Sequence, residues 1–198
     1  MSPAFQPFDP REDFTAKQRN LPHWRQSGAT YFVTFRLADS LPVEARVRFE
    51  EMRRLNDAEA FAWVEEYLDA GSGACPFKNP KHARTVASAL RHFDGKRYSL
   101  GAFVVMPNHV HALVQPARPT ALTSIVHSWK SFTAHELQRQ AGISGQVWQE
   151  ESYDRIVRDE TELRVFHDYI SANPTGARLL PGSFIVGQGS ARWFEHQP

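Results

Sequence analysis

One segment constrains the fold of this chain more than any other. Residues 104–114 read Val-Val-Met-Pro-Asn-His-Val-His-Ala-Leu-Val. β-Branched residues favour strands and a Pro-Asn pair favours a turn, so we predict an antiparallel hairpin of strands 98–105 and 109–115. Because side chains alternate along a strand, His109 and His111 lie on the same face of the second strand.

Two histidines on one face of a strand admit two interpretations. Beside a tight turn, two imidazoles can bind one divalent metal ion. The alternative is a pair of half-exposed histidines in an ordinary hairpin. The H-x-H pattern by itself does not distinguish these interpretations.

Composition places the chain among ordinary globular proteins. Its 198 residues are 41% hydrophobic and 23% charged, enough for one domain with a substantial core. The sequence has no apolar run that could span a bilayer and no apolar segment near its start, so we expect a cytoplasmic protein without a membrane partner. A single cysteine excludes an internal disulfide framework. A net charge of +1 means that nucleic-acid binding would need a local basic patch.

The rest of the chain alternates strand and helix patterns. We predict a strand over residues 29–37, helices within 42–92, the hairpin, a helix over 121–140 and a strand over 153–157. Asp159, followed by Glu162, predicts the start of a last helix over 160–172, which Asn173 and Pro174 should end. We expect residues 1–23 and 182–198 to be tails, and residues 24–181 to form one domain.

The order of these elements predicts an α+β fold. Strand, helices, strand, strand, helix, strand is the ferredoxin-like βαββαβ arrangement, here with a helical excursion over residues 42–97 in the first crossover and a C-terminal helix that carries a tyrosine. One antiparallel sheet would have helices on one face, which leaves the other face or an edge for a ligand.

The last helix carries a second group of polar residues. Tyr169 and Asn173 are four residues apart and therefore share a face of the helix. A tyrosine hydroxyl can be a nucleophile for phosphoryl transfer, and an asparagine carbonyl suits a hard divalent cation. The apolar neighbours of Tyr169 also fit a tyrosine of the core, so both interpretations stay open.

Four blocks of sequence together resemble a known family. They are MPNHVH at 106–111, HSWKSFT at 127–133, VWQEESYDRIVRD at 147–159 and YISANP at 169–174. In this order they resemble the REP-associated tyrosine transposases, of the insertion-sequence transposases in the HUH single-strand nuclease superfamily. The resemblance covers about residues 30–180. Residues 174–178 fit the family pattern more loosely, and the 42–97 excursion is longer than a minimal crossover.

The resemblance implies a specific activity. The family cuts single-stranded DNA with a tyrosine that forms a covalent 5′-phosphotyrosine link and frees a 3′-hydroxyl. Tyr169 matches this nucleophile, while Tyr153 is a rival that falls before the last helix. His109, His111 and Asn173 match the ligands of Mg²⁺ or Mn²⁺, although this set would also accept Zn²⁺.

The resemblance also implies a DNA partner. Family members recognise hairpins of repeated extragenic palindromes, and this branch resembles monomeric relatives, with a homodimer as the alternative. For DNA contacts we select Arg118, Lys130, Arg155 and Arg158, because basic side chains contact phosphates.

Two other functions remain open from the sequence. The same fold could bind hairpin DNA without catalysis, which a buried Tyr169 would favour. An unrelated metallohydrolase could use His109 and His111 with a carboxylate such as Asp168 or Glu150. The position of the Tyr169 hydroxyl relative to the two histidines distinguishes these functions.

Overall fold

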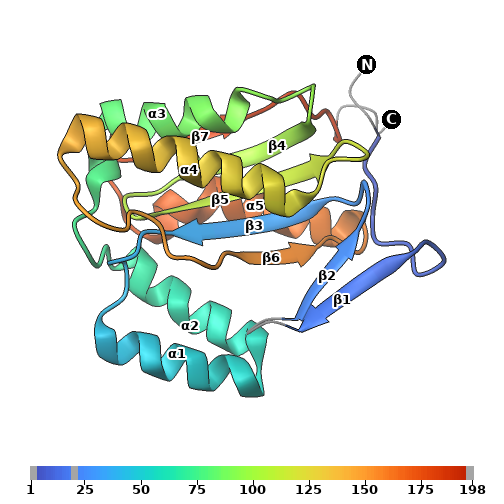
Figure 1. Ribbon diagram of the computed structural model, residues 1–198, viewed down its shortest axis with the longest axis horizontal. Helices are drawn as coiled ribbons and strands as arrows, with labels where there is room; N and C mark the ends of the chain where they lie inside the picture. Colours follow the sequence, from blue (N-terminus) through green and yellow to red (C-terminus); the bar gives the residue numbers. More distant parts are fainter. Residues whose placement is uncertain (1–3, 19–21, 195–198) are drawn as a thin grey trace.

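The protein is built on one five-stranded antiparallel sheet (Figure 1). The computed structural model describes residues 4–18 and 22–194. The elements of the sheet and its crossovers are β3 (Tyr31–Arg36), α1 (Val43–Leu55), α2 (Asp57–Asp69), the 3-10 helix η1 (Pro76–Lys78), α3 (Pro80–Arg91), β4 (Tyr98–Val105), β5 (His109–Pro116), α4 (Leu122–Ala141), β6 (Tyr153–Ile156), α5 (Glu160–Gly176) and β7 (Ile185–Gln188).

The strand order is β6-β3-β5-β4-β7, and every neighbouring pair is antiparallel. The first four of these strands, with α1 to α4 between them, give the predicted ferredoxin-like βαββαβ arrangement, and the predicted fold class is confirmed. The predicted hairpin is also present, as β4 and β5. β7 adds a fifth strand beside β4 at the edge of the sheet.

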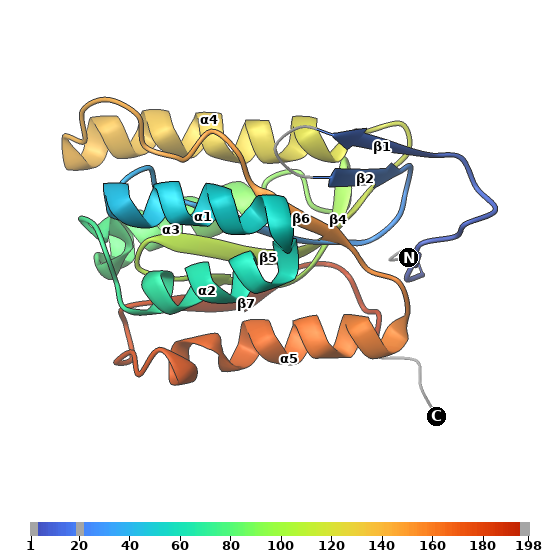
Figure 2. The same cartoon turned by 90° about the horizontal axis from the view of Figure 1, so that it is seen from below.

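Helices cover both faces of the sheet (Figure 2). α3 and α4 cover one face, where Val33 and Phe35 of β3 pack with Trp129 of α4. α5 covers the other face, where Phe32 packs with Ile170. The expectation that helices would lie on one face only is therefore wrong. Phe32 and its neighbours on β4 and β5 make the second face apolar as well, and burying that face against α5 is favourable.

The helical excursion forms a separate pair of helices beside the sheet. α1 and α2 share a small core of Leu41, Ala45, Val64 and Leu68. From α2, Phe61 packs against Phe32 and stacks on Tyr153 of β6 with 4.1 Å between ring centroids. The inner side of α2 therefore lies against the same sheet face as α5.

α3 and α5 each begin at a side-chain cap, and that of α5 is the one predicted from the sequence. Asn79 caps α3 by accepting a hydrogen bond from the backbone N–H of Lys81, with Pro80 as the first helical residue. Asp159 caps α5 in the same way, through the backbone N–H of Glu162.

The predicted end of α5 is wrong. The helix continues through Pro174 to Gly176. Pro174 lies in the last turn, so the missing N–H removes one hydrogen bond near the end of the helix rather than interrupting its centre.

Both predicted tails contain strands. β1 (Phe14–Gln18) and β2 (Pro22–Gln26) form a two-stranded sheet within and just after the predicted N-terminal tail. Its prolines obscured the pattern, although proline is tolerated at the first residue of an edge strand. β7, Trp193 and Phe194 pack onto the body within the predicted C-terminal tail. Residues 1–3, 19–21 and 195–198 of these tails lie outside the described residues.

Among the described residues, no helix is long and apolar enough to cross a membrane.

The cap of α5 yields a test of the fold. Asp159→Ala removes the acceptor for the Glu162 N–H and should lower the free energy of unfolding by about 1 kcal/mol in urea denaturation. Asp159→Asn should keep most of the stability because amide oxygens also cap. Asp168→Ala, at an exposed position of the same helix, is the control and should change stability by less than about 0.5 kcal/mol. Equal losses in both alanine variants would contradict the assigned cap.

Candidate functional site

The two histidines of β5 lie together on the sheet face that α5 covers. His109 and His111 are fully buried, and their ring centroids are 4.6 Å apart. The register of β3 with β5 pairs His111 with Thr34 and His109 with Arg36. The same-face placement predicted from the sequence is therefore present in the structure, but both imidazoles are buried rather than half-exposed.

A chain of hydrogen bonds orients His109. The side-chain amide of Asn108 donates to the carbonyl oxygen of Ser72 at 2.9 Å, which leaves its Oδ1 facing Nδ1 of His109 at 2.8 Å. Because Oδ1 can only accept, His109 carries its proton on Nδ1, and Nε2 presents a lone pair. This is the arrangement found where histidine binds a metal through Nε2.

His111 is held in a similar way. Its Nδ1 lies 2.7 Å from the hydroxyl of Thr34, and its Nε2 lies 3.1 Å from Oε2 of Glu65. The ring of His111 is therefore held between Thr34 and Glu65.

The carboxylate of Glu65 completes a group that sequence reasoning missed. Ligand atoms of Glu65, His109 and His111 all lie within 4.8 Å of one another. Glu65 comes from α2, where it follows Phe61 by four residues and lies beside Val64 on the inner side of the helix. An acidic residue within the apolar stripe of an amphipathic helix was the available signal, because such positions face the core.

Tyr169 contacts the same carboxylate. Its hydroxyl donates a hydrogen bond to Oε2 of Glu65, the oxygen that also lies beside Nε2 of His111. The tyrosine ring is edge-on to the His111 ring, with 5.3 Å between centroids. α5 and α2 therefore bring Tyr169 and Glu65 to the histidine pair from two sides.

Several buried polar atoms at this site have no hydrogen-bond partner. They are Nε2 of His109 and His111, Oε1 of Glu65 and Oδ1 of Asn173. Unsatisfied buried polar atoms are rare and destabilising, so a group of them indicates a ligand. Two imidazole nitrogens with carboxylate and amide oxygens suit Mg²⁺, Mn²⁺ or Zn²⁺. The side chains present therefore fit a divalent cation.

Burial and charge set the protonation of the site. Burial, together with repulsion from His111, lowers the pKa of His109 to about 3, so this imidazole is neutral at pH 7. Burial opposes ionisation of Glu65, but His111, His109 and the Tyr169 hydroxyl outweigh it and lower its pKa. Burial and the negative charge of Glu65 raise the pKa of Tyr169, which therefore stays protonated when it donates to Glu65.

The three arginines selected for DNA contacts each form an ion pair with a carboxylate. Arg118 pairs with Glu12 at 2.5 Å, and Arg155 and Arg158 share Glu162 at 2.7 Å and 3.0 Å. Each of these three arginines therefore contacts a carboxylate.

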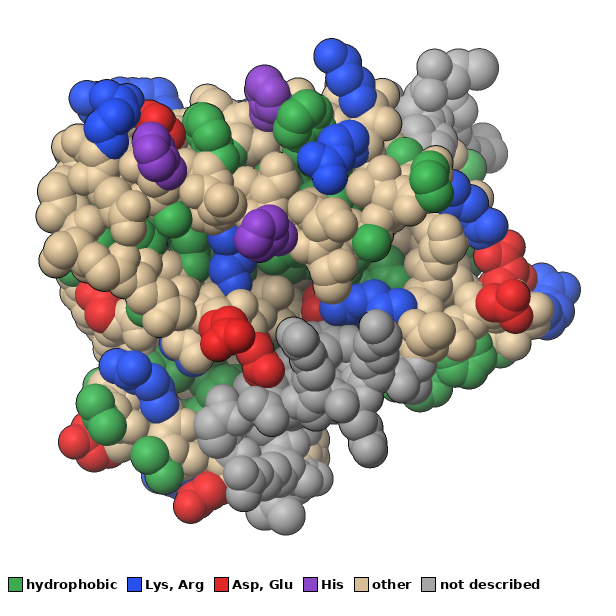
Figure 3. Space-filling model, in the orientation of Figure 1, with side chains coloured by type: hydrophobic (Ala, Val, Ile, Leu, Met, Phe, Trp, Pro, Cys, Tyr) green, Lys and Arg blue, Asp and Glu red, His purple; other side chains and the backbone are tan. Residues whose placement is uncertain are grey.

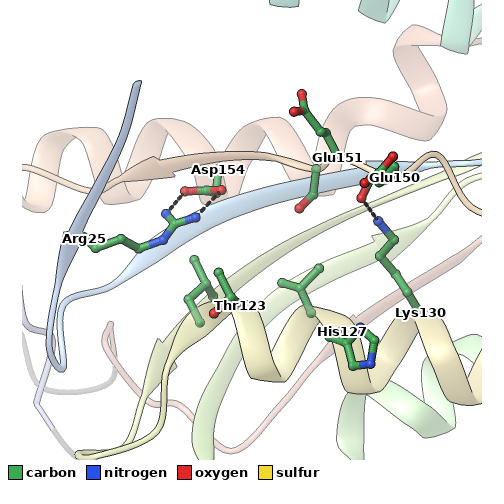
Figure 4. A pocket seen from close by; sticks show the side chains of 10 residues that line it. Arg25, Thr123, His127, Lys130, Glu150, Glu151 and Asp154 are labelled. Atoms are coloured by element: carbon green, nitrogen blue, oxygen red, sulfur yellow. Dashed lines mark hydrogen bonds and ion pairs between the residues drawn. The ribbon is translucent and has the colours of Figure 1, made fainter. Parts of the chain in front are cut away.

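Lys130 borders a cavity of about 480 Å³ between α4 and β6 (Figure 4). Its Nζ donates to the carbonyl oxygens of Gln149 and Glu150, and burial lowers its pKa to about 8. Arg25 and Asp154 form an ion pair at the other end of this cavity. The carboxylates and carbonyls of this cavity engage the two cations that line it.

The rival residues take other positions. Tyr153 pairs with Thr34 across β6 and β3, stacks on Phe61 and lines a small hollow with Glu65. Asp168 is exposed and contacts His167. Glu150 is exposed and lines the cavity of Lys130. The carboxylate beside His111 is that of Glu65, so neither Asp168 nor Glu150 supports the metallohydrolase alternative.

Comparisons with known proteins agree with the fold. A solved structure of a REP-associated tyrosine transposase bound to a REP hairpin superposes with a TM-score of 0.52 and 17% sequence identity. The superposition covers 84% of this chain and 76% of that chain, and at this identity it establishes similarity of fold.

A curated protein of Haemophilus influenzae, described as uncharacterized, is 29% identical over the aligned part. The alignment covers 36% of this chain and 52% of that protein, so the match spans about half of its length.

The family comparison covers the central and C-terminal parts of the site. Residues 78–173 match the family model described as "Transposase IS200 like". This segment contains β4, β5, α4, β6 and most of α5, and it ends at Asn173. The chain is therefore similar to IS200-like transposases over this segment, which includes His109, His111, Tyr169 and Asn173 but not Glu65.

Proposed function

We propose that this protein is a metal-dependent endonuclease and strand transferase that acts on single-stranded DNA next to a hairpin. One observation carries the proposal: the Tyr169 hydroxyl and Nε2 of His111 converge on the same oxygen of Glu65. A nucleophile and a set of metal ligands that meet at one carboxylate are what a phosphoryl transfer to tyrosine requires.

Tyr169 is the proposed nucleophile. Its O–H bond breaks as the proton moves to Oε2 of Glu65, and the phenolate oxygen attacks the phosphorus of the scissile phosphodiester. The bond from phosphorus to the 3′-oxygen then breaks, and the proton held by Glu65 returns to that oxygen, which leaves a 3′-hydroxyl and a 5′-phosphotyrosine. The raised pKa of Tyr169 makes an acceptor for the proton necessary, and Glu65 is already hydrogen-bonded to it.

His109, His111 and Glu65 would hold the cation, with Asn173 as a further oxygen donor. Bound there, a divalent cation would polarise the scissile phosphate and stabilise negative charge in the transition state. The two histidines are already oriented to bind a cation, because Asn108 and Thr34 fix their rings with Nε2 directed toward Glu65.

The proposed substrate follows from the family and its structural neighbour. The neighbour was solved bound to a REP hairpin, and the matched family consists of transposases. We therefore propose hairpin DNA as the partner here. A strand linked to Tyr169 keeps the energy of the broken phosphodiester, so transfer to a second strand needs no nucleotide triphosphate.

The nucleophile can be tested by trapping the covalent product. Tyr169→Phe should abolish the adduct between protein and 3′-labelled hairpin DNA, measured on denaturing gels with Mg²⁺ or Mn²⁺, because the attacking oxygen is gone. Tyr153→Phe, at the rival tyrosine, is the matched control and should form the adduct at the wild-type rate, since Tyr169 is the tyrosine beside His111 whose hydroxyl donates to Glu65. An adduct that persists in Tyr169→Phe would refute the assignment.

The metal site can be tested without turnover. Isothermal titration with Mn²⁺ should show at least about tenfold weaker binding for Glu65→Gln and for His111→Ala than for the wild type. Glu66→Gln, at the exposed neighbouring position, should bind as the wild type does. Thermal melting of each variant checks that it is folded. Unchanged affinity in Glu65→Gln would remove Glu65 from the proposed ligands.

A further inference from the structure

An arginine lies next to the histidine pair on the same face of the sheet. Arg36 is the last residue of β3, and the register places it directly opposite His109 of β5. Thr34, two residues earlier, contacts His111, so strand alternation directs Arg36 to the same face. Residues that oppose each other in this way have Cβ atoms about 5 Å apart. The proposed metal site therefore has a cationic neighbour, for which the proposed chemistry has no role.

This arginine is buried. Arg36 is only 8% exposed. Its Nη1 donates to Oγ of Ser40 at 3.2 Å, and its guanidinium carbon lies 5.9 Å from the centre of the Phe49 ring. A guanidinium group is always protonated in proteins, so it places a positive charge inside the fold at this point.

Arg36 lines a hollow that leads to the histidine pair. The hollow measures about 40 Å³, and Arg36 shares it with Thr34 and Glu65, the two residues that hold the ring of His111. Its other walls come from α1, α2 and the segment that leads into β6. They are formed by Phe49, Phe61, Val64, Leu68, Gln149, Glu151, Ser152 and Tyr153. The hollow therefore joins the surroundings of His111 to the guanidinium group.

The hollow is too narrow for a DNA strand as it stands. Its volume has room for a few water molecules, and both histidines are fully buried. A phosphodiester that approaches along the hollow has to displace side chains from its walls. Phe49 of α1 and Phe61 of α2 are the half-buried aromatic residues that line it. Once these rings move aside, Arg36 faces the incoming strand.

The surface around the hollow has no charge of a single sign. Figure 3 shows red and blue side chains intermixed in the lower part of the view, where Figure 1 places β6, α1 and α2. The whole chain has a net charge of only +1. A surface of mixed charge attracts a polyanion weakly, so a strand bound here depends on specific cationic side chains.

We propose that Arg36 binds a phosphate of the DNA strand that Tyr169 cuts, namely the phosphate next to the scissile one. A guanidinium group can donate two parallel hydrogen bonds to the oxygens of one phosphate. Glu65, which contacts both Tyr169 and His111, marks the position of the scissile phosphate. The guanidinium group extends toward Ser40 and Phe49, which suits the neighbouring phosphate rather than the scissile one.

The consequence of this contact is a fixed cleavage position. With one phosphate held by Arg36, the next phosphate along the strand lies at the Tyr169 hydroxyl, and a shift of the strand by one nucleotide breaks the contact. Gln149 and Ser152, on the opposite wall of the hollow, offer polar groups to the same strand. The inference rests on the proposed function for the identity of the strand and of the nucleophile.

The test removes the charge of one phosphate at a time. Neutral methylphosphonates replace single linkages along the single-stranded extension of a fluorescent hairpin, and binding is measured by anisotropy in EDTA, so that no strand is cut. For the wild type, one linkage beside the cleavage position should weaken binding by about tenfold, because Arg36 loses a charge-assisted pair. In Arg36→Gln the same linkage should weaken binding by less than about twofold, since the arginine is already missing.

Two further variants control for charge and for fold. Arg46→Gln, at an exposed arginine of α1 that donates to the carbonyl oxygen of Leu41, should show the wild-type penalty at every linkage. Arg36→Lys keeps the charge but not the fork, so its penalty should lie between those of the wild type and Arg36→Gln. Thermal melting checks the fold, and if Arg36→Gln is unfolded, Arg36→Lys decides. A purely structural role would leave the penalty at its wild-type size in both Arg36 variants, which would overturn the proposal.

The adduct assay separates this inference from the proposed activity. The wild type should cut one linkage, mapped from the released strand, whereas Arg36→Gln should also cut adjacent linkages. Adduct formation by the wild type with no linkage that depends on Arg36 would leave the nuclease standing and overturn the strand contact. A linkage that depends on Arg36 without any adduct would support the contact and refute the nuclease.

Discussion

The antiparallel pairing of β3 with β5 is the constraint on which the site depends. Its register places Thr34 opposite His111 and, through strand alternation, directs both histidines to the face that α5 covers. A shift of one residue would turn the imidazoles into the core of Val33, Phe35 and Trp129. Apolar contacts on both faces hold the register, so the geometry of the polar site is fixed by hydrophobic packing.

The polar groups at the site lower the stability of the fold but leave atoms free to bind a cation. Asn108 and Thr34 satisfy one nitrogen of each imidazole, while Nε2 of both rings, Oε1 of Glu65 and Oδ1 of Asn173 stay without hydrogen bonds. Each such buried atom is unfavourable by about 1–3 kcal/mol, which a bound cation would relieve. The same low-polarity surroundings keep His109 neutral and Tyr169 protonated. The site is preorganised: its side chains are held in place before a cation binds, and several of their polar atoms still lack partners.

Local sequence patterns predicted the elements, and they predicted contacts only where two residues share one element. His109 with His111, and Tyr169 with Asn173, follow from the periods of a strand and a helix. Glu65 was missed because it reaches His111 only through the packing of α2 on the sheet. Arg118 looked available in sequence, but a tertiary contact brings Glu12 to it. The pairs of Arg155 and Arg158 with Glu162 are local in sequence, and the one between Arg158 and Glu162 has the i,i+4 spacing that favours an ion pair. Burial of the second sheet face likewise depended on where α5 docks.

The small core shared by α1 and α2 has a dynamic consequence. Leu41, Ala45, Val64 and Leu68 hold the two helices to each other, apart from the two cores of the sheet. A pair of helices with a core of its own is the kind of unit for which local opening is less costly than unfolding of the whole protein. Glu65 lies on this pair, so local opening of α2 would separate the carboxylate from His111 while the sheet stays folded.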